Sequence, residues 1–312
     1  MRTAFIQAMT GLAASDPNVV LVVGDLGFSV VESYRERFPS QYLNAGVAEQ
    51  NMTGLAAGLA MAGKRVFTYS IANFPTLRCV EQVRNDVCYH NANVTVVSVG
   101  GGLAYGSLGP SHHASEDMAV MRSLPGMRVV CPGDPVEARE ATLALGTTDG
   151  PGYLRLSKTG EPVIHQDLKS FEIGRAIPVR AGRQAALLAT GAILENALKA
   201  AEMLAAQGLD CQVWSFHTVK PLDASAVLQA AQTGHVVTVE EHSILGGLGS
   251  AVAEVLAEAE LPRPVRFRRL GLRNEFCPVA GSQNYLRKLY GLHPEGLAAS
   301  VSEFLAKSIA KV

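Results

Sequence analysis

Two glycine-bearing segments of this 312-residue chain carry the side chains best suited to chemistry. In Asn44–Asn51, Glu49 follows a glycine turn at the start of a predicted helix. A carboxyl group there can share a proton with a ligand, or it can simply complement the helix dipole. In the second segment, a glycine-rich stretch from Gly100 to Gly109 leads to His112 and His113.

Such a stretch is costly in chain entropy, and its usual reason is close approach of the backbone to a ligand. His112 and His113 precede Glu116 and Asp117, which suggests a metal site. Adjacent histidines rarely converge on one ion, so we expect no metal to be held by this chain. A purely structural loop is the other interpretation.

Two further stretches follow predicted strands. Gly24–Ser29 comes directly after Val19–Val23, at the edge of a parallel sheet where ligands bind. A local turn capped by Asp25 is the alternative. Glu240–Ser250 opens a helix, but its glycine spacing departs from the dinucleotide fingerprint. We interpret it as a tight strand-to-helix turn, with nucleotide binding at Gly246–Gly249 as an alternative.

The elements that must position these residues alternate between two periods. Continuous apolar runs predict strands buried on both faces, and the longer stretches between them have helical spacing. Strand alternating with helix predicts parallel βαβ units, and the pattern occurs twice. We therefore expect an α/β fold with two domains, each a mostly parallel sheet flanked by helices. The predicted strands are Val19–Val23, Arg65–Tyr69, Val94–Val99, Arg128–Cys131, Tyr153–Leu156, Ala185–Ala189, Cys211–Phe216, Val236–Val239 and Val265–Arg269.

The predicted boundary lies where glycine and proline interrupt the periodicity, between Lys158 and Arg183. We expect domains at residues 1–165 and 184–312, with a linker at 166–183.

Composition limits the function. Apolar residues make up 48% and the net charge is -1, so a packed core is expected, while no basic field favours nucleic acid or an anionic membrane. The longest run of small apolar residues, Gly54–Gly63, is too short to span a bilayer. Five scattered cysteines are typical of reduced thiols in a cytoplasmic protein.

Four motifs in order resemble the thiamine-diphosphate-dependent transketolase family, in its pyrimidine-binding domain and C-terminal domain. The resemblance covers nearly the whole chain. The motifs are Asp25-Leu26-Gly27-Phe28-Ser29, Ala45-Gly46-Val47-Ala48-Glu49-Gln50, Gly106–His113, and Gly271-Leu272-Arg273-Asn274-Glu275-Phe276 with Gly281 and Tyr290-Gly291-Leu292 behind it.

This resemblance implies transfer of a two-carbon ketol unit from a ketose to an aldose. Glu49 matches the glutamate that hydrogen-bonds N1′ of the cofactor pyrimidine. The other residues expected at the cofactor are Asp25, Leu26, Tyr69, Ile71 and Phe74, of which Phe74 with Tyr69 and Ile71 would form an apolar wall. Core packing is the alternative for these three.

A motif of the family is missing here. Full-length members hold Mg²⁺ and the diphosphate with Gly-Asp-Gly followed by asparagine, and this chain contains no such motif. The resemblance therefore implies a split enzyme, whose N-terminal (alpha) subunit supplies that site in an α2β2 assembly.

For the substrate, His112 matches a histidine that binds donor-sugar oxygens, and His113 replaces a glutamine. Ser29, Arg155 and Lys158 are candidates for the sugar phosphate or its distal hydroxyls; a solvated surface lysine is the alternative for Lys158.

The chain also departs from the family at two positions. Leu108 stands where relatives carry an aspartate that hydrogen-bonds a hydroxyl of the donor sugar. Gly100 stands where many relatives carry another histidine. Because unpaired polar groups drive sugar discrimination, both departures favour an unusual, deoxy or unphosphorylated ketose.

Three rival functions stay open. Deoxyxylulose-phosphate synthase and the β subunit of 2-oxoacid dehydrogenases share the architecture and the glutamate, but they release CO₂ from a 2-oxoacid. A non-catalytic subunit that only completes an interface is the second rival, although Glu49 and His112 argue against it. Nucleotide binding is the third.

Overall fold

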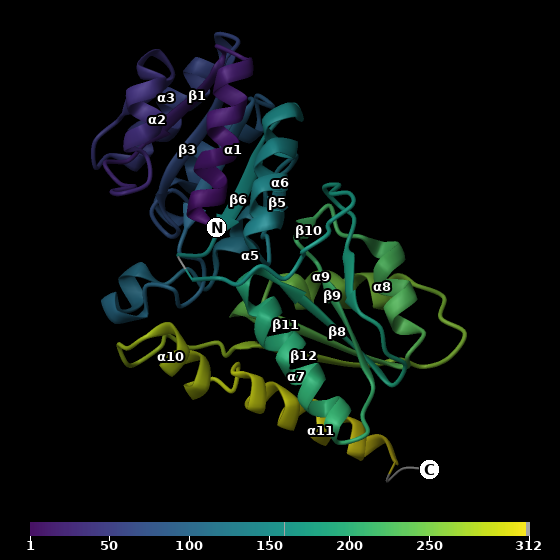
Figure 1. Cartoon of the computed structure of the whole chain (residues 1–312). Coiled ribbons are helices and arrows are strands. Elements are labelled where there is room, and N and C mark those ends of the chain that lie inside the picture. Colours follow the sequence, from purple (N-terminus) through teal and green to yellow (C-terminus); the bar gives the residue numbers. More distant parts are fainter. Residues whose placement is uncertain (159, 310–312) are drawn as a thin grey trace.

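The computed structural model describes residues 1–158 and 160–309, which fold into two α/β domains that lie side by side (Figure 1). Within these residues, the first sheet has seven strands in the order β10-β5-β6-β4-β3-β1-β2. They are parallel except for β10, which is antiparallel to β5. The strands are β1 Val19–Val23, β2 Tyr42–Asn44, β3 Arg65–Ile71, β4 Val94–Val99, β5 Arg128–Val130, β6 Gly152–Leu156 and β10 Thr218–Lys220.

Both faces of the first sheet are covered by helices. Val19, Leu21 and Val23 of β1 pack toward the helices α1 and α6, while Val20 and Val22 pack toward α3. Because side chains on both faces of the strand are buried, every position of β1 is apolar and the strand appears in the sequence as a continuous apolar run. The helices of this part are α1 Arg2–Ser15, α2 Glu32–Arg37, α3 Glu49–Met61, α4 Val80–Gln82 (continued by a π-helical turn, Val83–Cys88), α5 Asp117–Ser123 and α6 Pro135–Thr147.

The second sheet has five strands in the described residues, in the order β12-β11-β8-β9-β7, parallel except for β7. The strands are β7 Ile177–Arg180, β8 Ala185–Thr190, β9 Cys211–Ser215, β11 His235–Ser243 and β12 Arg266–Leu272. The helices are α7 Leu194–Ala206, α8 Ala224–Ala231, α9 Leu248–Glu258, α10 Gln283–Leu289 and α11 Pro294–Ile309.

The fold class predicted from the sequence is confirmed, but two strands depart from the predicted organisation. Strand β7 lies inside the segment expected to be a linker, and Pro178 is tolerated there because β7 is at the edge of its sheet. Strand β10 lies in the second half of the chain but joins the first sheet, where Thr218 pairs with Val130. The two sheets are therefore joined by more than one crossing of the chain.

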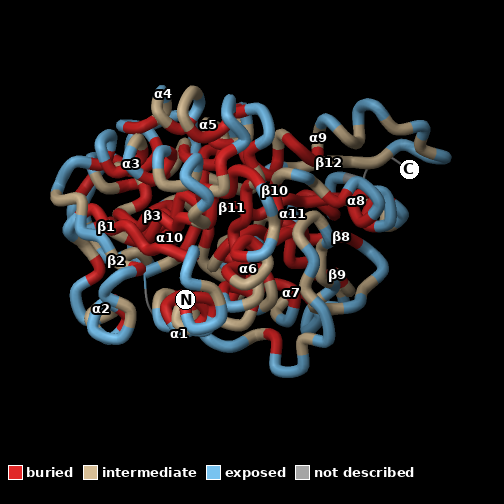
Figure 2. The backbone as a smooth tube through the Cα atoms, turned by 90° about the horizontal axis from the view of Figure 1, so that it is seen from above, coloured by how far each residue is buried: buried red, intermediate tan, exposed pale blue. Residues whose placement is uncertain are grey.

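The strands form the buried centre of both domains, and the exposed residues lie mainly in the loops and on the outer faces of the helices (Figure 2). No helix in the described part of the chain is long and apolar enough to cross a membrane.

Candidate active site

The candidate site lies at the carboxyl edge of the first sheet. The segments that follow β1, β2, β3 and β4 carry Asp25, Glu49, Phe74 and the loop of residues 100–113, called the histidine loop below. Because parallel strands end at one edge, residues far apart in sequence converge there.

Glu49 begins α3 and is 1% exposed. Its Oε2 accepts a hydrogen bond of 2.7 Å from Nη1 of Arg78, whereas its Oε1 is buried and has no hydrogen-bond partner among the described residues. A Cβ placed on Gly24 would lie 3.6 Å from Cγ of Glu49, so the end of β1 leaves little spare room beside this carboxyl. An unpaired buried carboxyl oxygen is costly on its own and fits a ring nitrogen that enters as its partner.

Phe74 and His112 complete a row of side chains that starts at Glu49. The Arg78 guanidinium lies 4.7 Å from the centroid of the Phe74 ring, and that ring lies 5.2 Å from the His112 ring in an edge-on arrangement. Asn73 supports the same region, because its Nδ2 donates to the backbone oxygen of Ser111 at 2.6 Å. The structure therefore brings together three residues singled out in the sequence: Glu49, Phe74 and His112.

Arg78 and Asn73 were missed by the sequence reasoning. Arg78 follows Phe74 by four residues, and this short spacing is a signal that could have been used. The pattern alone does not tell that its guanidinium meets a carboxylate from another helix.

The loop after β1 is held by a side-chain pair. Asn44 Nδ2 donates to Asp25 Oδ1 at 2.9 Å, and the Asp25 backbone N–H donates to Asn44 Oδ1 at 3.1 Å. Asp25 and Ser29 both have positive φ, 54° and 62°, and both are exposed, while Leu26 is half-buried. This segment is an ordered, open rim beside Glu49.

The two loop histidines differ in environment. His112 is half-buried, and its Nδ1 lies 3.0 Å from the hydroxyl oxygen of Ser111. His113 is buried, and burial lowers its pKa below the ordinary value, which leaves a neutral imidazole at pH 7. Only His112 of the two meets the Phe74 ring.

Tyr69 and Arg155 take internal positions. Tyr69 is 2% exposed and stacks on Phe5 with ring centroids 5.7 Å apart, as in the core-packing alternative. Arg155 Nε donates to Asp117 Oδ2 at 2.7 Å, and its Nη2 donates to the backbone oxygen of Ala114 at 2.8 Å. Both side chains are therefore engaged by contacts within the chain.

Ile71 and Lys158 remain at the surface of the same edge. Ile71 is half-buried at the end of β3. Lys158 is exposed, with its Nζ 4.9 Å from the centroid of the Tyr105 ring. An ammonium group in this position is accessible to an anion from solvent.

The two departures from the family pattern have different structural settings. Gly100 has φ +86°, and a Cβ there would lie 2.1 Å from Cε2 of Tyr105, so the Tyr105 ring occupies the space that a side chain would need. Leu108 is 52% exposed, so it places an apolar side chain at the surface of the histidine loop. The Tyr105 ring therefore excludes a side chain at position 100, whereas the exposed position 108 has room for a polar one.

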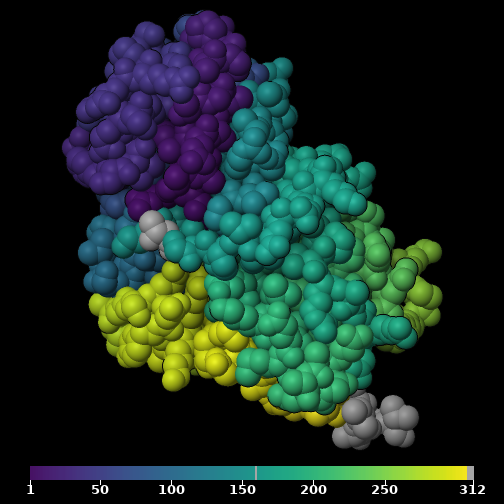
Figure 3. All heavy atoms as spheres, viewed as in Figure 1, coloured from purple at the N-terminus to yellow at the C-terminus, as the bar shows by residue number. Residues whose placement is uncertain are grey.

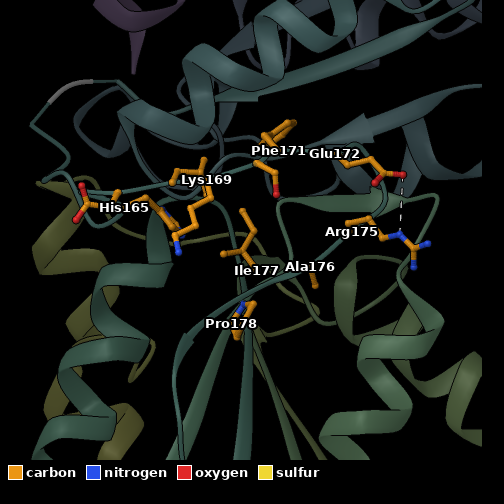
Figure 4. A pocket seen from close by; sticks show the side chains of 11 residues that line it. His165, Lys169, Phe171, Glu172, Arg175, Ala176, Ile177 and Pro178 are labelled. Carbon is orange, nitrogen blue, oxygen red and sulfur yellow. Dashed lines mark ion pairs between the residues drawn. The ribbon is translucent and has the colours of Figure 1, made fainter.

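A broad groove elsewhere, of about 730 Å³, lies along residues 165–178 and is lined by both charge types (Figure 4). Glu172 and Arg175, which lie next to each other on one side of it, form an ion pair at 3.9 Å (Figure 4). Glu49, Phe74 and His112 do not line this groove, and it has no constellation of the kind found at the sheet edge. No group of three or more potential ligands suited to a metal ion occurs in the described residues.

Comparison with known families matches both halves of the chain. Residues 1–161 match the transketolase pyrimidine binding domain, and residues 174–297 match the transketolase C-terminal domain.

Two of the curated relatives match this chain over nearly their whole length. The chain is 36% identical over 309 residues to one of the subunits of the apulose-4-phosphate transketolase of Phocaeicola vulgatus, covering 98% of this chain and 97% of that protein. It is 38% identical to 6-deoxy-6-sulfo-D-fructose transketolase subunit SqwH of Clostridium sp. strain MSTE9, covering 97% and 94%. The 1-deoxy-D-xylulose-5-phosphate synthase of Syntrophotalea carbinolica is 35% identical, but the match covers only 47% of that protein.

A solved structure described as a split gene transketolase, inactive beta4 tetramer, superposes with a TM-score of 0.87 at 36% identity, covering 98% of this chain and 97% of that one. The two matched domains and the relatives that align over nearly their whole length indicate the same family. The chain belongs to the transketolase family, and it corresponds to the C-terminal section that forms a separate subunit in split transketolases.

Proposed function

We propose that this chain is the beta subunit of a split, thiamine-diphosphate-dependent transketolase of the cytoplasm. In this proposal it transfers a two-carbon ketol unit from a ketose, phosphorylated or otherwise substituted at its far end, to an aldose. The observation that carries the proposal is the buried, unpartnered Oε1 of Glu49 beside Phe74 and His112.

The residues present fit the pyrimidine half of the cofactor. When bound, thiamine diphosphate supplies the electron sink for breaking and making the carbon–carbon bond. Glu49 would hold the proton shared with pyrimidine N1′ at Oε1, and Phe74 would cover the ring with its aromatic face. Asp25 and Leu26 would border the same slot from the rim after β1.

The substrate side would be formed by the histidine loop and its neighbours. His112 would hydrogen-bond donor oxygens beside the ring, and His113 would assist from its buried position. Lys158 and Ser29 would bind the anionic or hydroxyl-bearing end of the sugar. The apolar Leu108 favours a donor that lacks a hydroxyl at that point, because a polar group there would lose its partner.

A partner must supply the diphosphate and Mg²⁺ site, because the Gly-Asp-Gly motif is missing from the sequence. Helix α3 offers a surface for it: no atom lies within 4 Å of a Cβ built on Gly54 or Gly58, and Met61 is 57% exposed nearby. Close approach of another helix to this face suits an N-terminal (alpha) subunit in an α2β2 assembly.

The test uses co-purified subunits. Thiamine diphosphate and Mg²⁺ are titrated into each chain alone and into the complex, and binding is measured by calorimetry. Transfer is then assayed with a panel of ketose donors. We expect tight binding and transfer only with the complex, and Glu49→Gln should abolish transfer while the complex still assembles. Tight binding to this chain alone, or full transfer by Glu49→Gln, would contradict the proposal.

The decarboxylating rivals are separated in the same experiment. The similarity to 1-deoxy-D-xylulose-5-phosphate synthase makes a 2-oxoacid the necessary second donor to test. CO₂ release from pyruvate without ketol transfer would favour that rival, and an assembled complex without either reaction would favour a non-catalytic subunit.

A further inference from the structure

A buried carboxylate of the second sheet binds the base of the histidine loop. Glu241 lies in β11, is 4% exposed, and accepts a hydrogen bond on Oε1 from the backbone N–H of Leu103 at 2.7 Å. Leu103 belongs to a loop of the first domain, so this bond crosses from the second domain to the first. The function assigned to the loop so far makes no use of Glu241.

Helix α10 completes the surroundings of this carboxylate. Gln283 Nε2 donates to Oε1 at 2.8 Å and to Oε2 at 3.1 Å, and Arg287 Nε forms an ion pair with Oε2. The Arg287 and Glu241 side chains are 8% and 5% exposed, so the pair is shielded from water. These donors offset the cost of burying the charge, and loss of one of them would leave it uncompensated.

The loop backbone is shaped to fit this contact. Gly102 has φ +67°, and a Cβ there would lie 2.6 Å from the backbone oxygen of Glu241. Gly102 and Ala114 exchange two backbone hydrogen bonds of 2.9 Å, which closes the loop at its base. Gly281 donates its N–H to the backbone oxygen of Gly106 at 3.1 Å, so the segment before α10 holds the loop at a second point.

The space-filling view agrees with these contacts. The yellow C-terminal segment that includes α10 packs directly beneath the blue-teal part of the first domain (Figure 3). The histidine loop is therefore fixed from the second domain, although the residues it presents belong to the first.

We propose that Glu241, held by Gln283 and Arg287, is a positioning residue that fixes the histidine loop so that His112 stands beside Phe74. The proposal rests on the proposed function, because it assigns His112 to donor binding. Glu241 touches neither His112 nor Phe74 and acts through the backbone of the loop. A released loop regains conformational entropy, and a displaced histidine loses its alignment with the donor.

The experiment compares two neighbouring buried carboxylates. Glu241→Gln should raise hydrogen exchange in peptides covering residues 100–113 by about tenfold or more, measured by mass spectrometry on the assembled complex. In the same complex the donor KM should rise by about tenfold, with thiamine diphosphate affinity unchanged. Glu240→Gln is the matched control, because Glu240 accepts from the N–H groups of Leu248 and Gly249 and serves α9 instead of the loop.

Glu240→Gln should speed exchange at the start of α9 and leave residues 100–113 as they are. If Glu241→Gln does not fold, Gln283→Met removes one donor and keeps the carboxylate. This variant should raise the hydrogen exchange of residues 100–113 and the donor KM in the same direction, but by less. Unchanged exchange at 100–113, or equal effects of both carboxylate variants, would overturn the proposal. Failure of the proposed function looks different: the wild-type complex would transfer no ketol unit, while the exchange result for the loop would still stand.

Discussion

Arg78 Nη1 lies 2.7 Å from Oε2 of Glu49, and the same guanidinium lies 4.7 Å from the centroid of the Phe74 ring. One side chain thus pairs with the carboxyl and stacks on the aromatic ring of the proposed pyrimidine slot. The arginine is 49% exposed and the glutamate 1%, so the carboxyl depends on the pair more than the guanidinium does.

Arg78→Met should destabilise the chain, because it leaves a buried carboxylate without its cation. After allowing for the exposure of the arginine, we expect a loss of about 1–2 kcal/mol at pH 7, a few degrees in Tm. The double variant with Glu49→Gln should recover most of the lost stability. The control is Arg84→Met, because Arg84 is an exposed arginine that is hydrogen-bonded to the neighbouring Asn85 side chain. Strictly additive losses in the double variant would show that the pair has no energetic coupling.

His112→Ala should lower kcat/KM for the donor by about 100-fold in the assembled enzyme, since one hydrogen-bonding group at the reacting sugar is removed. Thiamine diphosphate affinity should stay the same. His90→Ala, at an exposed histidine beside Tyr89, is the matched control. Steady-state kinetics with calorimetry check both, and equal kinetics of the two variants would remove His112 from the site.

Leu108→Asp should change donor preference and leave the fold intact, because Leu108 is 52% exposed. The new carboxylate can accept a hydrogen bond from a donor hydroxyl, so the ratio of kcat/KM for a hydroxylated ketose over its deoxy counterpart should rise about tenfold. Competition between the two donors measures the ratio directly. An unchanged ratio would show that this position does not face the donor.

Gly100→His would restore the residue type that the resemblance expects, yet it should destabilise the chain strongly. The backbone has φ +86° and the Tyr105 ring fills the space, so we expect a loss of about 3 kcal/mol or more. Tyr105→Ala added to Gly100→His should recover part of it. Gly58→Ala, with open space at its Cβ, is the control in thermal unfolding.

A buried cluster around Glu137 should make stability fall as pH rises. Burial raises the pKa of Glu137 to about 7, from an unfolded value of 4.5, and Asp134 and Glu137 hold the pKa of His165 above its ordinary 6.5 despite burial. Both groups bind protons more tightly in the folded chain. The stabilisation from Glu137 is therefore full below its unfolded pKa of 4.5 and is lost as pH rises through about 7, and the contribution of His165 is lost as pH rises through its own raised pKa.

The Asp134 carboxyl, with a pKa below its usual 3.8, acts in the opposite sense and titrates at lower pH, outside this window. Thermal unfolding between pH 5 and 8 should show the decline, and Glu137→Gln should flatten it by removing one of the two titrations. A wild-type Tm that rises across this range, or a variant with the same slope, would contradict the assignment.

The sequence by itself determined the α/β class, nine of the strands, and the order of the four motifs and hence the family; it also proposed Glu49, Phe74 and His112 as candidate site residues. These follow from periodicity and from residues that stand directly after strands, which are local signals.

Only the tertiary structure decided which of the candidate residues lie together. Tyr69 and Ile71 lie on one strand two residues apart, yet Tyr69 stacks on a helix in the core and Ile71 stays at the edge. Arg155 meets Asp117 from α5, and Glu241 meets Leu103, 138 residues away. Such pairs depend on how separate elements pack against each other, and the spacing of residues along the chain does not show which distant residues come into contact.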